Sequence, residues 1–171
     1  MGDAGYIILF VVGVFAVSFV YVWLKEKAKK NIFCKEQYEM QKNLTENAYV
    51  FTYQGTTEQL KSAIKNRIPV DNSFSANFVG GNYTINSETA DEITFLHGAK
   101  ITTGGGGDEF TATIKFSQTE KASRAVAQII RWKVHDGVTR KAGIQAMQGF
   151  FNSVSLAVKD VDANSSVNIV K

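Results

Sequence analysis

The chain has 171 residues, a formal net charge of +3 and a single cysteine, Cys34. One cysteine excludes an intramolecular disulfide, so the fold must depend on the burial of apolar side chains. A cluster of charges in residues 25–30 supplies most of the excess positive charge, and residues 31–171 are close to neutral. Nucleic-acid-binding domains are normally strongly basic, so we expect no nucleic-acid partner.

The first long segment of the chain is apolar. Residues 5–24 (GYIILFVVGVFAVSFVYVWL) contain no charged side chain, and a helix of about 20 residues spans the roughly 30 Å hydrocarbon core of a bilayer. A cleaved secretory signal is the alternative, but residues 1–4 carry no Lys or Arg, and the small residues suited to cleavage lie inside the apolar run. The pattern therefore predicts a retained transmembrane anchor over residues 1–24.

The charges beside this anchor predict its orientation. No basic residue precedes the apolar run, whereas four follow it directly: Lys25, Lys27, Lys29 and Lys30. Cytoplasmic flanks collect Lys and Arg, so we expect the amino terminus outside and the rest of the chain in the cytoplasm, at the cell membrane. We also expect these lysines to contact anionic lipid headgroups, at about 1 kcal/mol per charge.

Residues 25–47 contain many Lys, Glu and Gln and neither Pro nor Gly. This composition predicts that the membrane helix continues as a polar juxtamembrane stalk. Four apolar residues keep a loose four-residue spacing: Ala28, Ile32, Met40 and Leu44. We favour a solvated helix here over one that rests on the domain or on a partner stalk.

Residues 48–160 have the pattern of a single α+β domain. Residues 48–54 are β-branched and aromatic, as in a strand. Thr56 and Gln59 form a capping box for a helix that Pro69 ends. Further strands are predicted over residues 74–79, 83–86, 92–96, 109–117 and 124–134. These elements predict an antiparallel sheet of about five or six strands.

The last two predicted strands and the helix after them show which faces are apolar. Residues 109–117 place Phe110, Ala112, Ile114 and Phe116 on one face. In the next strand we expect Val126, Ile130, Trp132 and Val134 to share a side. Residues 139–158 follow a helical period, with Ile144, Met147, Phe151, Val154 and Val158 on the face that would cover the sheet. Residues 161–171 form a tail that is either a frayed end or a short edge strand.

This succession of elements resembles the helix-grip fold of the START and Bet v 1-like superfamily over residues 48–160. The resemblance implies a curved antiparallel sheet that wraps a long carboxy-terminal helix, often around an apolar cavity. It implies binding of a lipid or another apolar small molecule, and the candidate wall residues are Phe110, Phe116, Trp132, Met147 and Phe151. A compact version without a cavity and an unrelated α+β sandwich stay open as alternatives.

The sequence contains no catalytic constellation. The glycines of residues 104–107 are followed by neither Gly-Lys-Ser/Thr nor a helix, so we expect a loop and not a phosphate site. The acidic residues at 160–164 lack the glycine and glutamate of a calcium loop. His135 has only His97 as a second imidazole, and Cys34 lies far in sequence from both. We therefore expect no metal, no cofactor and no enzymatic activity.

Residues 115–141 are basic, with Arg131 and Lys133 on the strand face opposite Trp132. This face would suit phospholipid headgroups or an acidic partner, although an ordinary solvated face is the favoured interpretation. The sequence thus predicts a membrane-anchored, non-enzymatic module at the cytoplasmic face, which binds an apolar ligand, a lipid or a membrane protein. Its oligomeric state is not predicted.

An alternative function follows from a second resemblance. Type IV pilin-like proteins, which assemble outside the cell, also join a long amino-terminal apolar helix to an α+β head. Here the leader, residues 1–5, lacks the basic residue of such proteins, and Phe10 stands where they usually carry a glutamate.

Overall fold

A computed structural model of the protein describes residues 3–30, 34–73, 82–98, 108–119, 122–135 and 137–171. The strand predicted over residues 74–79 and the glycine loop at 104–107 lie outside these ranges. The described elements are, in chain order, α1 (Asp3–Ala28), α2 (Lys35–Glu46), β1 (Ala48–Tyr53), α3 (Thr57–Arg67), β2 (Tyr83–Glu88), β3 (Glu92–His97), β4 (Phe110–Gln118), β5 (Ser123–Trp132), α4 (Lys141–Val161) and β6 (Ser166–Val170).

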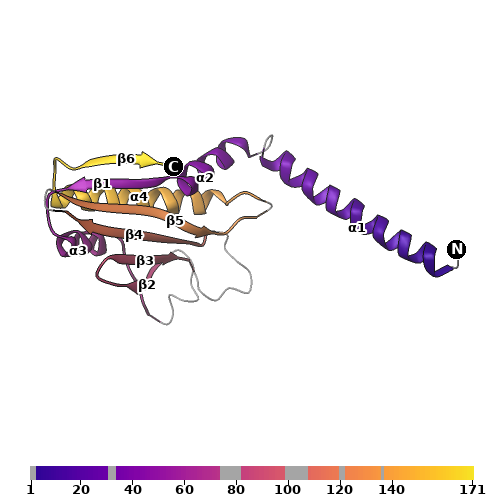
Figure 1. Ribbon diagram of the computed structural model, residues 1–171, viewed down its shortest axis with the longest axis horizontal. Helices are drawn as coiled ribbons and strands as arrows, with labels where there is room; N and C mark the ends of the chain where they lie inside the picture. Colours follow the sequence, from indigo (N-terminus) through magenta and orange to yellow (C-terminus); the bar gives the residue numbers. More distant parts are fainter. Residues whose placement is uncertain (1–2, 31–33, 74–81, 99–107, 120–121, 136) are drawn as a thin grey trace.

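The strands form one antiparallel sheet with the order β2-β3-β4-β5-β1-β6. Helices α3 and α4 pack against each other beside the sheet, while α1 projects away from the domain (Figure 1). The predicted α+β class, with an antiparallel sheet against a long carboxy-terminal helix, is therefore confirmed. Strand β6 follows α4 and pairs with β1, so the edge-strand interpretation of the tail is the one observed.

Helix α3 begins and ends where the sequence predicts. The Gln59 N–H donates to Thr56 Oγ1 at 3.2 Å, and Gln59 Oε1 accepts from the Thr56 N–H at 2.9 Å. These two bonds satisfy amide groups that the first turn of a helix leaves without partners. At the other end, Pro69 follows the last capping residue, Ile68, and cannot continue the helix.

The core lies between the sheet and the two helices. Strand β4 turns the predicted face inward, because Phe110, Ala112, Ile114 and Phe116 are all buried to an exposed fraction of 6 % or less. Strands β1 and β3 contribute Phe51, Tyr53, Ile93 and Phe95 to the same core. From α4, Ile144, Met147, Phe150, Phe151, Val154, Ala157 and Val158 complete it.

The predicted inner face of β5 is wrong for most of its length. Val126 is half-buried and Ile130 is 49 % exposed, whereas Ala125, Ala127 and Ile129 are buried. A bulge explains the change of side: the pairing shifts between Thr111 and Ala112 of β4, and an extra residue of β5 is accommodated there.

Because of this bulge, Trp132 returns to the side of the core and pairs with Phe110. Val134, beyond the end of β5, is 46 % exposed. The small alanines leave room on the inner face for neighbouring rings, such as that of Phe116, which pairs with Ala125. Of the four residues expected to share a side, only Trp132 packs against the core.

The juxtamembrane helix is not continuous, which corrects the predicted stalk. Helix α1 ends at Ala28, and Cys34, whose N–H donates to the carbonyl oxygen of Lys29 at 2.7 Å, has a non-helical backbone conformation. Helix α2 begins at Lys35 in a new direction (Figure 1). It is not solvated on all sides, because Leu44 joins the core and Gln41 is buried beside it.

Candidate membrane interface

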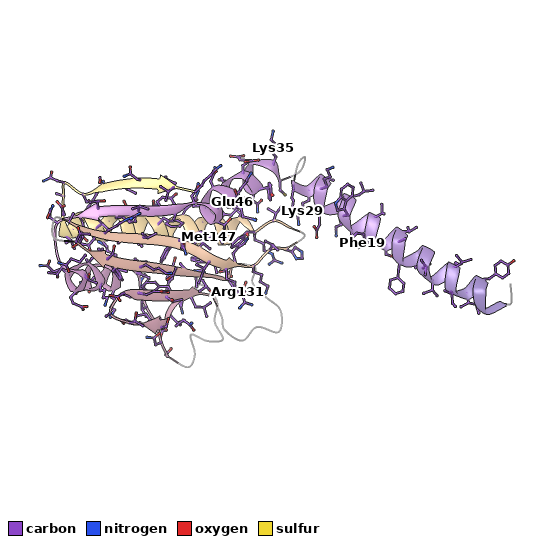
Figure 2. The ribbon with its side chains drawn as sticks, viewed as in Figure 1. Phe19, Lys29, Lys35, Glu46, Arg131 and Met147 are labelled. Carbon is purple, nitrogen blue, oxygen red and sulfur yellow. The ribbon has the colours of Figure 1, made fainter. Side chains whose placement is uncertain are left out.

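Helix α1 exposes apolar side chains around its whole circumference. The large apolar residues between Tyr6 and Leu24 are 44 to 76 % exposed, as the row of side chains along α1 in Figure 2 illustrates. Within the described part of the chain, Tyr6–Ala28 is the one stretch long and apolar enough to cross a membrane. Such a surface is poorly solvated by water, and its length and composition are those of a membrane anchor or a signal sequence.

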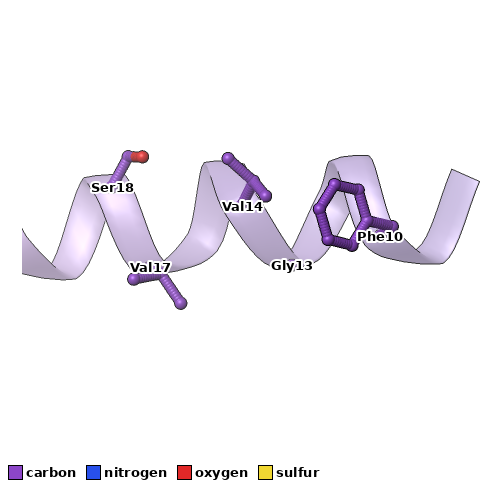
Figure 3. A pocket seen from close by; sticks show the side chains of 5 residues that line it. All are labelled: Phe10, Gly13, Val14, Val17 and Ser18. Carbon is purple, nitrogen blue, oxygen red and sulfur yellow. The ribbon is translucent and has the colours of Figure 1, made fainter. Parts of the chain in front are cut away.

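One face of α1 carries an open hollow of about 360 Å³ (Figure 3). Five residues line it: Phe10, Gly13, Val14, Val17 and Ser18. Their spacing of three and four places them along one side of the helix. Gly13 creates the space, since a Cβ there would meet nothing within 4 Å. Lipid chains or a neighbouring helix fill such a space in a bilayer, and it defines no ligand site by itself.

Aromatic and basic side chains meet at the carboxy-terminal end of the apolar run. Trp23 lies near this end, and the Lys27 ammonium group is 4.8 Å from the centre of its ring. Amphipathic rings and lysines are both favoured at the depth of the lipid headgroups. The predicted headgroup residues follow the uncharged run that ends at Leu24: Lys25 and Lys27 lie in the last turn of α1, and Lys29 and Lys30 come directly after the helix.

The end of α1 contacts the loop between β5 and α4. Lys29 Nζ donates to the carbonyl oxygen of His135 at 3.1 Å. Gly137, with a positive φ of 78°, lies so close to Lys30 that a Cβ at this position would collide with the lysine side chain. Lys30 Nζ is also 5.6 Å from the centre of the Tyr38 ring. Residues about one hundred positions apart in the sequence are thus adjacent at this junction.

Two glutamines of α2 hold the same loop. The Thr139 N–H donates to Gln41 Oε1 at 2.6 Å, and Gln37 Nε2 donates to the Thr139 carbonyl at 2.5 Å. The glutamines are four residues apart, on one side of the helix. Sequence reasoning missed this clamp, because the spacing of the glutamines was visible but nothing in the sequence marks Thr139 as their partner.

The five predicted wall residues lie in or beside the packed core. Four are buried, Phe110, Phe116, Met147 and Phe151, and Trp132 is half-buried against them. The ring of Phe150 packs against two of these rings: its centre is 6.2 Å from the centre of the Phe110 ring and 5.5 Å from that of Phe151. The Phe151 ring also stacks on the ring of Tyr49, with 4.0 Å between the two ring centres. Phe110 and Phe151, which were expected to line a cavity, thus pack against other aromatic rings of the core, and the ligand pocket stays a prediction.

Three buried or half-buried polar side chains of the domain lie within hydrogen-bond distance of backbone oxygens. Tyr83 donates to the Ala146 carbonyl at 3.1 Å, and burial raises the pKa of Tyr83 to about 12. His97 Nδ1 lies 3.0 Å from the Asp108 carbonyl. Lys61 Nζ donates to the Thr89 carbonyl at 2.9 Å. Each of these contacts fixes a strand or a turn, which is the usual role of a satisfied polar group in a core.

The described residues contain no group of three or more His, Cys, Asp or Glu side chains that could hold a metal ion. Cys34 is a half-buried free thiol at the start of α2, and His135 is exposed in the β5–α4 loop. Comparison of the chain with family models, with curated proteins and with solved structures gave no match. The function must therefore be inferred from the geometry of this chain.

Proposed function

We propose that this chain is a single-pass membrane protein whose α+β domain, at the cytoplasmic face, binds a lipid or a membrane-protein partner and catalyses no reaction. One observation carries the proposal. The apolar surface of α1 is uncovered around the whole helix, and it ends at a cluster of lysines, one of which, Lys29, donates a hydrogen bond to the domain. This combination supports an anchor whose domain stays near the membrane surface.

The packing of the core favours a binding surface on the outside of the domain. An apolar ligand between the sheet and α4 would have to separate Phe151 from Tyr49 and Phe150 from Phe110. These rings already bury one another, so the sheet–helix cavity of the helix-grip resemblance is the less favoured site. Mass spectrometry of organic extracts of the purified full chain tests this directly. An apolar molecule recovered in a stoichiometric amount would instead favour a binding site in the core, between the sheet and α4.

Labelling of Cys34 tests the side of the membrane on which the domain lies. A membrane-impermeant thiol reagent added to intact cells is expected to leave Cys34 unlabelled, and the same reagent should label it after lysis. The reciprocal control is Asp3→Cys in a Cys34→Ser background, which we expect to react in intact cells.

Labelling of Cys34 in intact cells would contradict the cytoplasmic domain and favour the alternative, an exported pilin-like assembly subunit. Release of the full chain from membranes by alkaline carbonate would contradict the anchor itself. The two experiments therefore separate an error in orientation from an error in membrane attachment.

A further inference from the structure

We propose that the end of the domain nearest α1 is a binding surface for anionic lipid headgroups, formed by basic residues of β5 and α4 together with the juxtamembrane lysines. The inference rests on the proposed function, since it requires α1 to span the membrane. It extends the predicted headgroup contacts of residues 25–30 to residues about one hundred positions later in the chain.

The topology brings these residues together. Strand β5 ends at Trp132 and α4 begins at Lys141, so Arg131 and Lys141 lie at the same end of the domain. The loop that joins them is the one whose His135 carbonyl accepts a hydrogen bond from Lys29. Figure 2 shows Arg131 and Lys29 at the end of the domain from which α1 projects.

The height of this end above the bilayer follows from helix geometry. Lys29 is five residues beyond Leu24, which is about 7.5 Å along a helix that rises 1.5 Å per residue. The headgroup layer on each side of a bilayer is about 5 to 8 Å thick. A loop bonded to Lys29 therefore lies at the outer edge of the headgroups, within about one Debye length of the phosphates at physiological salt.

Basic residues exceed acidic ones at this end. Of the described residues in 25–36, 108–109 and 131–141, the basic ones are Lys25, Lys27, Lys29, Lys30, Lys35, Arg131, Lys133, Arg140 and Lys141. The acidic ones are Glu26, Glu36, Asp108 and Glu109, and Asp136 belongs to the same loop in the sequence. Lys133 is partly neutralised by Glu109, whose Oε1 is 3.4 Å from its Nζ. The net charge of this surface is positive and suits an anionic partner.

The opposite end of the domain has a different arrangement of charge. There Arg67 and Lys65 form close ion pairs with Asp160 and Glu88. These two basic side chains are neutralised by their acidic partners, in contrast to the basic excess at the end nearest α1. An acidic protein is the other partner that such charges would fit. We favour the lipid because the surface already lies at the plane of the headgroups.

The chain offers a matched pair of double variants. R131Q/K141Q removes one exposed charge from β5 and one from α4 at the membrane end. R124Q/K159Q removes the same charges from the far end of the same two elements, so both variants lose equal net charge. Circular dichroism and thermal melting confirm that each variant is folded before it is compared.

The measurement is native mass spectrometry of the full chain in mixed micelles of phosphatidylcholine and phosphatidylglycerol. We expect the wild type to retain phosphatidylglycerol in preference to phosphatidylcholine. R131Q/K141Q should lower this preference severalfold, since one basic residue near a charged surface changes partitioning by about fivefold at most. R124Q/K159Q should leave it within about twofold, and about 1 M salt should abolish it by screening.

Equal preference in the two double variants would overturn the inference, as would a wild type that does not discriminate between the lipids. Reconstitution into bilayers of phosphatidylcholine alone reports separately on the proposed function. Failure of α1 to insert there would contradict the anchor, whereas insertion without a preference for phosphatidylglycerol contradicts only the headgroup surface.

Discussion

Helices α1 and α4 are both rich in apolar residues, yet their surroundings differ completely. In α4 the apolar residues lie along one stripe and are buried against the sheet, while Leu156 on the far side is 47 % exposed. In α1 they surround the helix, and none of the side chains that the structure describes from Tyr6 to Leu24 enters the core. A single apolar stripe can be buried by a protein core, whereas an apolar circumference is typical of a membrane-spanning helix or a signal sequence.

The largest effect is expected from the core stripe of α4. Phe150 is fully buried and contacts the rings of Phe95, Phe110 and Phe151. Phe150→Ala should lower the free energy of unfolding by about 3 to 5 kcal/mol, because a large cavity replaces the ring. Chemical denaturation of the full chain in detergent measures it. Leu156→Ala, on the exposed side of the same helix, is the control and should change it by less than about 0.5 kcal/mol.

A charge in the middle of α1 should act on the membrane and not on the core. Val14→Arg is expected to disfavour insertion by about 2.5 to 3.5 kcal/mol at the centre of the bilayer, while the domain keeps its fold. The fraction of the chain that resists carbonate extraction measures insertion, with Val14→Leu as the control. Full extraction resistance of Val14→Arg would mean that α1 is not held by hydrocarbon.

Removal of the hydrogen bonds between α2 and the β5–α4 loop should lower the stability of the fold by an intermediate amount. Gln41→Ala leaves the buried N–H of Thr139 without its acceptor, which costs about 1 to 3 kcal/mol. Hydrogen exchange at Thr139 should rise together with the loss of stability. Gln37→Ala is the comparison, since it removes only the bond to the Thr139 carbonyl, and an unchanged exchange rate in Gln41→Ala would contradict the clamp.

Loss of the α3 cap is expected to be smaller. Thr56→Ala removes the oxygen that accepts the Gln59 N–H, and caps of this kind contribute about 1 kcal/mol. Thr56→Ser keeps the acceptor and should restore the stability measured by denaturation. If Thr56→Ser were as unstable as Thr56→Ala, loss of the hydroxyl would not be the cause of the lower stability of Thr56→Ala.

The smallest effect should come from the exposed ion pair between α3 and α4. A hydrogen bond from Arg67, assisted by its charge, holds the pKa of Asp160 below its ordinary value of 3.8. The pair therefore stabilises the fold above that ordinary pKa, and the contribution is lost as the pH falls through the lower, folded-state pKa. Thermal melting should show a small difference between wild type and Arg67→Gln at neutral pH that disappears in acid.

Sequence reasoning succeeded where the signal is local. The apolar run of α1, the capping box of Thr56 and Gln59, and the alternation of β4 each depend on neighbouring residues, and each is found in the structure. The order of elements was enough to predict an α+β fold.

Sequence reasoning failed where a contact between residues far apart in the chain determines the local structure. The bulge opposite Thr111 reverses the inner face of β5, and no residue of β5 itself reveals it. Helix α2 is bonded to Thr139, which is 98 residues from Gln41. The link between Lys29 and the β5–α4 loop spans 106 residues and was equally invisible. Most of the proposed headgroup surface is assembled by such contacts.

The position of β1 between β5 and β6 has a consequence for biosynthesis. The first strand of the sheet finds both its neighbours in the last third of the chain. During translation α1 leaves the ribosome long before either neighbour does, and sheets built from such remote pairings form slowly. In the proposed topology α1 tethers the nascent protein while β1 is still unpaired, and the sheet closes only after β5 and β6 have been synthesised.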